Sequence, residues 1–199
     1  MKNFSITTKK GDDGTTGLLD NSRVQKYDLR PETYGTLDEA AAFLGLARAK
    51  STLARTKEIL LVIQNHLYLI NAELACPVDS LHVLKYKIST AHLQQLETFS
   101  ASTEKELALP RKFVLYGQSE SSAYLDIARA VVRRAERRFV ELNQIEKLDH
   151  ATISAYLNRL SDTLFLLARY EEYRNGIPFV HPDDSNPSDL GDPCGLIGD

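Results

Sequence analysis

Apolar residues that recur every three or four positions restrict most what this chain can fold into. Between residues 52 and 75 such residues form a continuous stripe: Leu60, Ile63, Leu67, Ile70 and Leu74. This spacing places the side chains on one face of an α-helix. Pro77 lacks a backbone N–H and ends such a helix. The segment therefore predicts an amphipathic helix with one buried face.

The same periodicity predicts four further helices, over about 36–50, 89–106, 119–145 and 148–175. Thr36 and Glu39 fit a capping box at the start of the first of them. Their apolar stripes include Leu37, Ala41, Leu44 and Ala47, then Ala128, Val132, Ala135, Phe139 and Leu142, then Ile153, Leu157, Leu160, Leu164 and Leu167. Strand signals are scarce. We therefore expect an all-α fold, a five-helix bundle with a four-helix up-and-down core plus an extra helix.

Composition assigns residues 1–180 to one domain and residues 181–199 to an acidic, flexible tail. That tail has five aspartates, three prolines and no Lys or Arg. The net charge of −3 gives no reason to expect nucleic acid or an anionic membrane as a partner. Cys76 and Cys194 have no metal-binding or redox spacing. Neither a leader nor an apolar run of about 18–20 residues is present, so we expect a cytoplasmic location without membrane contact.

The polar stretch TTKKGDDGTTGLL, residues 7–19, lies in a loop-like segment that spans residues 1–30. A frayed N-terminus is one interpretation. The other is a phosphate-binding loop, because Gly11, Gly14 and Gly17 allow backbone N–H groups to turn toward an anion. Further candidate phosphate ligands are the hydroxyls of Thr15 and Thr16 and the cations Lys9, Lys10, Arg23, Lys26 and Arg30. The carboxylates of Asp12 and Asp13 could hold Mg²⁺ through water.

The fourth predicted helix has four polar residues beside its apolar stripe: Arg129, Arg133, Glu136 and Arg137. The spacing i, i+4, i+7 and i+8 places them on one face. A solvated face with Arg–Glu pairs is one interpretation. A polyanion site is the other, because guanidinium groups match phosphate oxygens and stay charged. The last helix adds Asn158 and Asp162, one turn apart, with Arg159 close by.

Five motifs in order resemble those of the PduO-type ATP:cob(I)alamin adenosyltransferases. They are T-x-x-G-D-x-G-x-T at Thr8–Thr16, R-V-x-K at Arg23–Lys26, a Tyr-Gly-x-x-Asp-Glu motif at 34–39, R-R-A-E-R at Arg133–Arg137 and N-R-L-S-D at Asn158–Asp162. The resemblance covers roughly residues 5–175. It implies five-helix bundles that assemble as homotrimers, with an active site at each subunit interface. The implied reaction transfers the 5′-deoxyadenosyl group of ATP to cob(I)alamin and releases triphosphate.

The resemblance also implies roles for individual residues. Asp38 would pair with Arg133 across the interface, and Phe113 would crowd the lower face of the cobalt. Residues implied in binding ATP with Mg²⁺ are Thr8, Lys9, Gly11, Asp12, Gly14, Thr15, Thr16, Arg23, Lys26, Arg129, Glu136, Arg137 and Asn158. Implied partners are ATP, the corrinoid, a flavin-dependent reductase and a cobalamin-dependent enzyme.

The sequence departs from the family pattern at a few positions. Thr33 replaces an Ala, Ala41 an Asn and Asp126 a His, and the usual Pro-Gly-Gly turn reads Tyr116-Gly117-Gln118. The changes at Tyr116, Gln118 and Asp126 lie near the expected corrin pocket. Two alternatives therefore stay open: a non-catalytic relative that binds ATP or delivers cobalamin, and a structural bundle that docks a partner.

Overall fold

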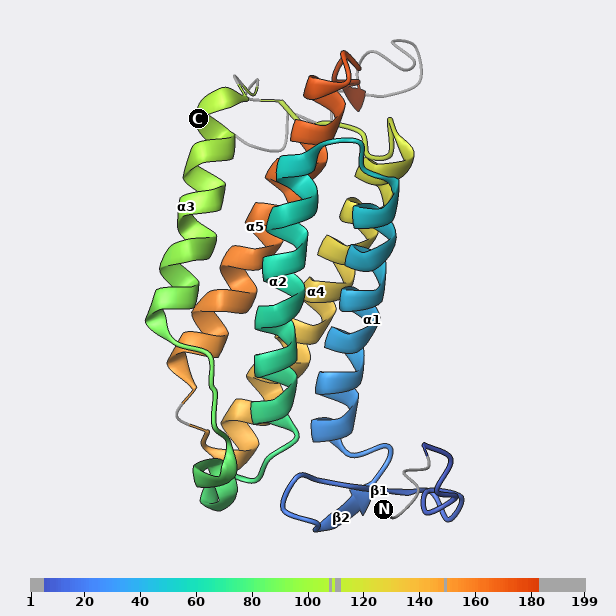
Figure 1. Cartoon of the computed structure of the whole chain (residues 1–199), viewed down its shortest axis with the longest axis vertical. Helices are drawn as coiled ribbons and strands as arrows, with labels where there is room; N and C mark the ends of the chain where they lie inside the picture. Colours follow the sequence, from blue (N-terminus) through green and yellow to red (C-terminus); the bar gives the residue numbers. More distant parts are fainter. Residues whose placement is uncertain (1–5, 108, 110–111, 149, 183–199) are drawn as a thin grey trace, which may run out of the picture.

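The computed structural model describes residues 6–107, 109, 112–148 and 150–182. Within these ranges the chain is mainly helical (Figure 1). The elements are β1 (Thr15–Gly17), β2 (Arg23–Gln25), α1 (Leu29–Lys50), α2 (Ala54–Leu74), the 3-10 helix η1 (Val78–Val83), α3 (Thr90–Glu106), α4 (Glu120–Glu146) and α5 (Ala151–Arg174). The five predicted α-helices are confirmed.

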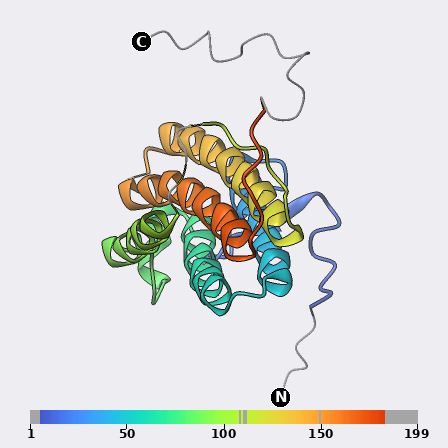
Figure 2. The ribbon, with the colours of Figure 1, turned by 90° about the horizontal axis from the view of Figure 1, so that it is seen from above.

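The helices lie side by side along the long axis, and consecutive helices alternate in direction (Figure 1). Helix α1 packs against α4 and α2, while α5 packs against α4 and α3. Seen from above, α3 lies at the edge of the bundle beside α5 (Figure 2). The architecture is therefore a four-helix core of α1, α2, α4 and α5, with α3 as the additional helix.

The predicted apolar stripes meet in one core. Leu60, Ile63, Leu67 and Ile70 of α2 are fully buried, as are Val132 and Phe139 of α4 and Leu157, Leu160 and Leu164 of α5. Burial of one such aliphatic side chain stabilises the fold by roughly 1.5–3 kcal/mol. The stripes thus specify which face of each helix points inward.

Helix α1 begins seven residues earlier than the sequence predicted, at Leu29. The predicted capping box at Thr36 and Glu39 is wrong, because Thr36 lies inside the helix and donates its hydroxyl to the Glu32 carbonyl (2.7 Å). Pro31 explains the early start, since proline is well tolerated in the first helical turn. Capping boxes instead form at Ser89 before α3 and Ser119 before α4.

The segment before α1 is more ordered than the expected loop. Strands β1 and β2 pair antiparallel, with Thr16 opposite Val24. The hairpin closes through the Leu18 N–H, which donates to the Ser22 carbonyl (2.8 Å). It lies beside the N-terminal end of α1, at the opposite end of the bundle from the loop that joins α3 to α4 (Figure 1).

None of the helices that the structure describes combines the length and apolar character needed to cross a bilayer. The predicted acidic tail lies almost wholly outside the described residues, which end at Pro182.

Candidate functional site

The arginines of α4 divide into two groups that face different neighbours. Arg134 pairs with Glu39 of α1, and Arg138 lies 3.9 Å from the Glu32 carboxylate, also on α1. Arg129 and Arg133 line a groove of about 480 Å³ instead. Arg134 and Arg138 therefore form a solvated face paired with α1, whereas Arg129 and Arg133, which belong to the predicted polar face, line the groove. The polyanion site on that face stays a prediction.

This groove is formed by α3, α4, α5 and Leu109, and it mixes cations with apolar surface. Its lining residues are Ser100, Glu104, Leu109, Arg129, Arg133, Arg159, Ser161, Asp162, Phe165 and Leu166. Arg159 lies 3.5 Å from Asp162 and 3.3 Å from Glu97. By contrast, the exposed Arg133 guanidinium forms no ion pair with any residue that the structure describes. Arg133 is thus available to an anionic ligand.

Other predicted residues of α4 and α5 come together next to the groove. The Asn158 amide donates to the Glu136 carboxylate (3.2 Å), which links the two helices. The Arg137 guanidinium donates to the Arg133 carbonyl (3.0 Å). The structure therefore brings Glu136, Asn158 and Arg137 into the neighbourhood of Arg133.

Asp38 is exposed on α1, and within the described part of the chain it forms no pair with Arg133. The neighbouring positions Glu39 and Arg134 join α1 to α4 instead. The predicted pairing of Asp38 with Arg133 across an interface stays a prediction.

The N-terminal loop is organised by its own side chains. Asp13 accepts hydrogen bonds from the backbone N–H of Thr15 (2.9 Å) and from its hydroxyl (2.7 Å). These bonds, and Arg23 at 3.3 Å, hold the pKa of Asp13 below its usual value. Arg23 also donates to the Lys10 carbonyl and the Thr15 hydroxyl. Arg23, predicted to bind a ligand, therefore braces the loop itself.

Two glycines in the loop are required by its geometry. Gly14 has a φ of +83°, a conformation that side chains disfavour. A Cβ at Gly11 would lie 3.2 Å from the Lys26 ammonium nitrogen and 3.2 Å from the Thr15 carbonyl oxygen. The Lys26 N–H donates to the Gly14 carbonyl (3.0 Å). Lys26 is therefore held against the glycine turn, while Thr8, Lys9 and Asp12 are exposed.

Arg30 does not belong to this loop, contrary to the sequence-based expectation. It is 6% exposed and donates to the carbonyls of Leu74 (2.6 Å) and Cys76 (3.0 Å). It also pairs with Glu146 at the end of α4. Arg30 therefore ties together the ends of α2 and α4 and does not face a ligand.

The loop before α4 exposes two aromatic side chains. Phe113 is 70% exposed and Tyr116 is 56% exposed, so Phe113 is not a core residue of the single chain. The backbone of this loop is held by the segment after α5. His181 Nδ1 donates to the Phe113 carbonyl (2.6 Å), and the Leu115 N–H donates to the Val180 carbonyl (2.8 Å).

Sequence reasoning missed a buried ionic cluster between α4 and α5. Arg169 is fully buried and donates to Asp126 (2.8 Å) and Glu172 (2.8 Å). Burial raises the pKa of Asp126, although Arg169 partly opposes this shift. The sequence has a signal only for the neighbouring Glu171: the stripe that ends at Leu167 continues to this residue, which places a carboxylate at a core position. Glu171 is fully buried and accepts hydrogen bonds from Ser51 and Ser121, both at 2.7 Å.

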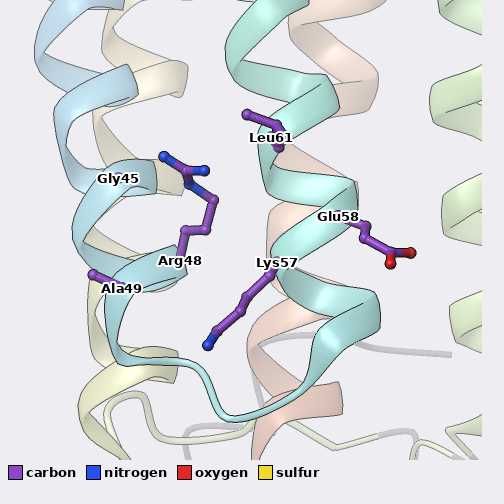
Figure 3. Close-up of a pocket in the computed structure, with 6 residues that line it drawn as sticks. All are labelled: Gly45, Arg48, Ala49, Lys57, Glu58 and Leu61. Carbon is purple, nitrogen blue, oxygen red and sulfur yellow. The ribbon is translucent and has the colours of Figure 1, made fainter.

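A second hollow, of about 330 Å³, lies between α1 and α2 and contains no predicted residue. Gly45, Arg48, Ala49, Lys57, Glu58 and Leu61 line it. Figure 3 shows the Arg48 and Lys57 side chains reaching into the space between the two helices, while the Glu58 carboxylate points away. Arg48 is half-buried and Lys57 is exposed, and none of the residues that the motifs single out lines this hollow.

Comparisons with known proteins match this arrangement. A family model described as cobalamin adenosyltransferase matches residues 6–171. A corrinoid adenosyltransferase of Bacillus subtilis is 40% identical over 186 residues, covering 92% of this chain and 94% of its own. One of Citrobacter freundii is 38% identical over 170 residues, covering 85% of this chain and 96% of its own.

Solved structures agree with the sequence comparison. A phenylalanine-to-alanine variant of a PduO-type ATP:corrinoid adenosyltransferase from Lactobacillus reuteri, complexed with cobalamin and ATP, superposes with a TM-score of 0.82. It is 29% identical, and the match covers 89% of this chain and 98% of that chain. An arginine-to-lysine variant complexed with ATP gives a TM-score of 0.77. With this sequence match, this fold and these five ordered motifs, the chain belongs to the cobalamin adenosyltransferase family.

Proposed function

We propose that this chain is an ATP:corrinoid adenosyltransferase. The observation that carries the proposal is the groove on α4, where Arg133 faces solvent without an ion pair among the described residues, in a chain whose relatives are named for this activity. In the reaction, cobalt(I) attacks C5′ of ATP, the new Co–C bond forms, and the C5′–O bond breaks with release of triphosphate.

The residue types suit this chemistry. Cobalt(I) is itself the nucleophile, so the protein needs no activated Ser or Cys. It has to hold C5′ in line with cobalt and to stabilise the charge that develops on the leaving triphosphate. Arg129 and Arg133 supply fixed positive charge for the second task.

We assign the triphosphate to the N-terminal loop together with this groove. The phosphates would be contacted by Gly11, Gly14, Thr15, Thr16 and Lys26. The exposed Thr8 and Lys9, at the start of the loop, would also face the ligand. Mg²⁺ would arrive bound to ATP. Asp13 is engaged with Thr15 and Arg23, so the exposed Asp12 is the carboxylate that would reach this ion through water.

A complete site requires a second copy of the chain. The N-terminal segment with the glycine loop lies beside the N-terminal end of α1 (Figure 1), whereas the residues that line the groove belong to α3, α4, α5 and the segment after α3. We therefore propose a homotrimer in which the loop of one subunit meets the groove of the next, and Asp38 meets Arg133. Light scattering coupled to size exclusion tests this assembly, and a monomeric mass at micromolar concentration would contradict it.

The exposed Phe113 would contact the corrinoid. We propose that its ring excludes the lower axial ligand of cobalt, which makes cob(II)alamin four-coordinate and easier to reduce. The cofactor-like substrate supplies the reactive metal, and the protein tunes its surroundings. A cytoplasmic location, a flavin-dependent reductase and a cobalamin-dependent acceptor enzyme remain predictions of the resemblance.

The deciding experiment is anaerobic. The protein is mixed with chemically reduced cob(I)alamin and MgATP, and the visible spectrum is followed for adenosylcobalamin while triphosphate is quantified. Equal amounts of both products are expected. Measurable MgATP binding without product would favour a non-catalytic ATP-binding or cobalamin-delivering relative, and absence of binding would favour a structural bundle.

A second readout tests the loop assignment without catalysis. MgATP should protect residues 7–27 from limited proteolysis. Equal cleavage with and without MgATP, at a nucleotide concentration that saturates binding, would contradict the role given to the loop.

A further inference from the structure

Arg129 is held between two side chains, Tyr116 and Asp126, at which the sequence departs from the family pattern. On one side its guanidinium lies over the Tyr116 ring, 4.7 Å from the ring centroid. On the other side its Nε lies 3.7 Å from the Asp126 Oδ1. The Arg129 side chain is 18% exposed, so its orientation is fixed by these two neighbours.

Asp126 is itself fixed by the buried cluster. Its Oδ2 accepts from Arg169 (2.8 Å), and Arg169 is held in turn by Glu172. The same cluster reaches the loop that carries Tyr116, because the Gln118 N–H donates to Glu172 (3.4 Å). The three departures from the family pattern, at positions 116, 118 and 126, thus meet in one cluster.

The contact between Asp126 and Arg129 is incomplete. Asp126 Oδ1 and Arg129 Nε are both buried, and neither has a hydrogen-bond partner among the described residues. A charge-assisted hydrogen bond would need a shift of about 1 Å from the observed 3.7 Å. The pair is therefore close enough to attract by charge, and it is about 1 Å short of a hydrogen bond.

We propose that Tyr116 and Asp126 are positioning residues, which aim the Arg129 guanidinium into the groove beside Arg133. The inference rests on the proposed function, in which Arg129 binds the triphosphate of ATP. Because a long arginine side chain loses rotamer freedom when it binds, holding it in the bound orientation beforehand strengthens phosphate binding. Both side chains then affect catalysis only through Arg129.

The first test is Tyr116→Ala, in which an exposed loop residue is changed and the fold is kept. The KM for MgATP should rise about 3- to 10-fold, as expected for one cation–π contact. The KM for cob(I)alamin and the melting temperature should stay unchanged. Tyr86→Ala is the matched control, because Tyr86 is 64% exposed and stacks with Lys85 (5.0 Å) far from the groove. A raised KM for the corrinoid alone would overturn the inference.

A double-mutant cycle separates positioning from an independent structural effect. In an Arg129→Ala background, Tyr116→Ala and Asp126→Asn should cause no further rise in the KM for MgATP. Full additivity would overturn the inference. If Arg129→Ala binds MgATP like the wild type, the proposed role of Arg129 fails. If Arg129→Ala is impaired while Tyr116→Ala equals the wild type, only the positioning inference fails.

Discussion

Arg169 on α5 and Arg133 on α4 show the same side chain in opposite surroundings. Arg169 is fully buried and paired with both Asp126 and Glu172. Arg133 is exposed, lines the groove and has no ion pair among the described residues. The first arginine satisfies charges that the fold has already buried, whereas the second leaves its charge for a ligand. Removal of each should therefore damage a different property of the protein.

The largest expected effect is on stability, from Arg169→Ala. Removing one partner of a buried ionic cluster leaves Asp126 and Glu172 uncompensated, which destabilises a protein by about 3–5 kcal/mol. Denaturant unfolding measures this loss. Arg174→Ala is the control: Arg174 is exposed, pairs with Glu106 at 3.6 Å and donates to the Tyr170 hydroxyl (3.2 Å). Because the Arg174 side chain is open to solvent, its loss should be smaller, about 1 kcal/mol. Equal losses of unfolding free energy in the two variants would contradict the different roles assigned to the buried and the exposed arginine.

A second buried polar group predicts acid sensitivity. Burial lowers the pKa of His66 to about 4, and the nearby His92 ring adds to the shift. His66 binds a proton less readily in the folded protein than in the unfolded chain. Its contribution to the free energy of unfolding is therefore fully present above pH 6.5, and it falls by about 3 kcal/mol as the pH drops from 6.5 to 4.

The measurement for His66 compares the pH dependence of unfolding in the wild type with that of His66→Gln. The subtraction removes the contribution of carboxylates common to both proteins. His66 also bonds to the buried Tyr156 hydroxyl (2.9 Å), so the variant is compared by its slope between pH 4 and 6.5 and not by its absolute stability. Identical slopes would contradict the prediction.

For Arg133→Ala we expect a loss of activity with little loss of fold. If Arg133 stabilises the leaving triphosphate as proposed, its removal should lower kcat by about 100-fold or more, while the melting temperature of the subunit changes little. Arg134→Ala is the matched control, because it removes the adjacent arginine that pairs with Glu39. Turnover at the wild-type level in Arg133→Ala would contradict the assignment.

The smallest effect is expected for Phe113→Ala. Activity with cob(II)alamin and a reductase should fall by more than activity with chemically prepared cob(I)alamin, with a difference within about tenfold, or 1.4 kcal/mol. Parallel assays with the two corrinoid states measure this difference. Equal losses in both assays would show that the exposed ring does not act on the reduction step.

The apolar stripes predicted the helices and their buried faces because burial of aliphatic side chains depends mainly on sequence spacing. Leu60 to Leu74 and Ile153 to Leu167 lie in the core as expected. The start of α1 was predicted too late, because the Thr36 hydroxyl can bond either as a cap or to its own helix. Local sequence does not separate these two states.

The charged residues were harder to predict, because their roles depend on partners distant in sequence. Arg30 resembles a loop cation in sequence, yet it bonds to Leu74 and Cys76, more than 40 positions away. Arg133 and Arg134 are adjacent and chemically identical, and only the packing of α1 and α5 against α4 separates their roles. Asp126 was recognised as a departure from the motif, but its partner Arg169 could be found only in three dimensions.

The Arg30 contacts have a consequence for motion. They fix the first turn of α1 to the last turns of α2 and α4, immediately after the hairpin ends. The tip of the hairpin is also tied to the bundle, because the Leu19 N–H donates to the Ala75 carbonyl (2.9 Å), whereas the glycine turn bonds only within the N-terminal segment. The glycine turn can therefore open without loosening the bundle. Amides of residues 11–17 should exchange with solvent hydrogen through local opening and slow down with MgATP, while the middle of α1 should exchange only with global unfolding.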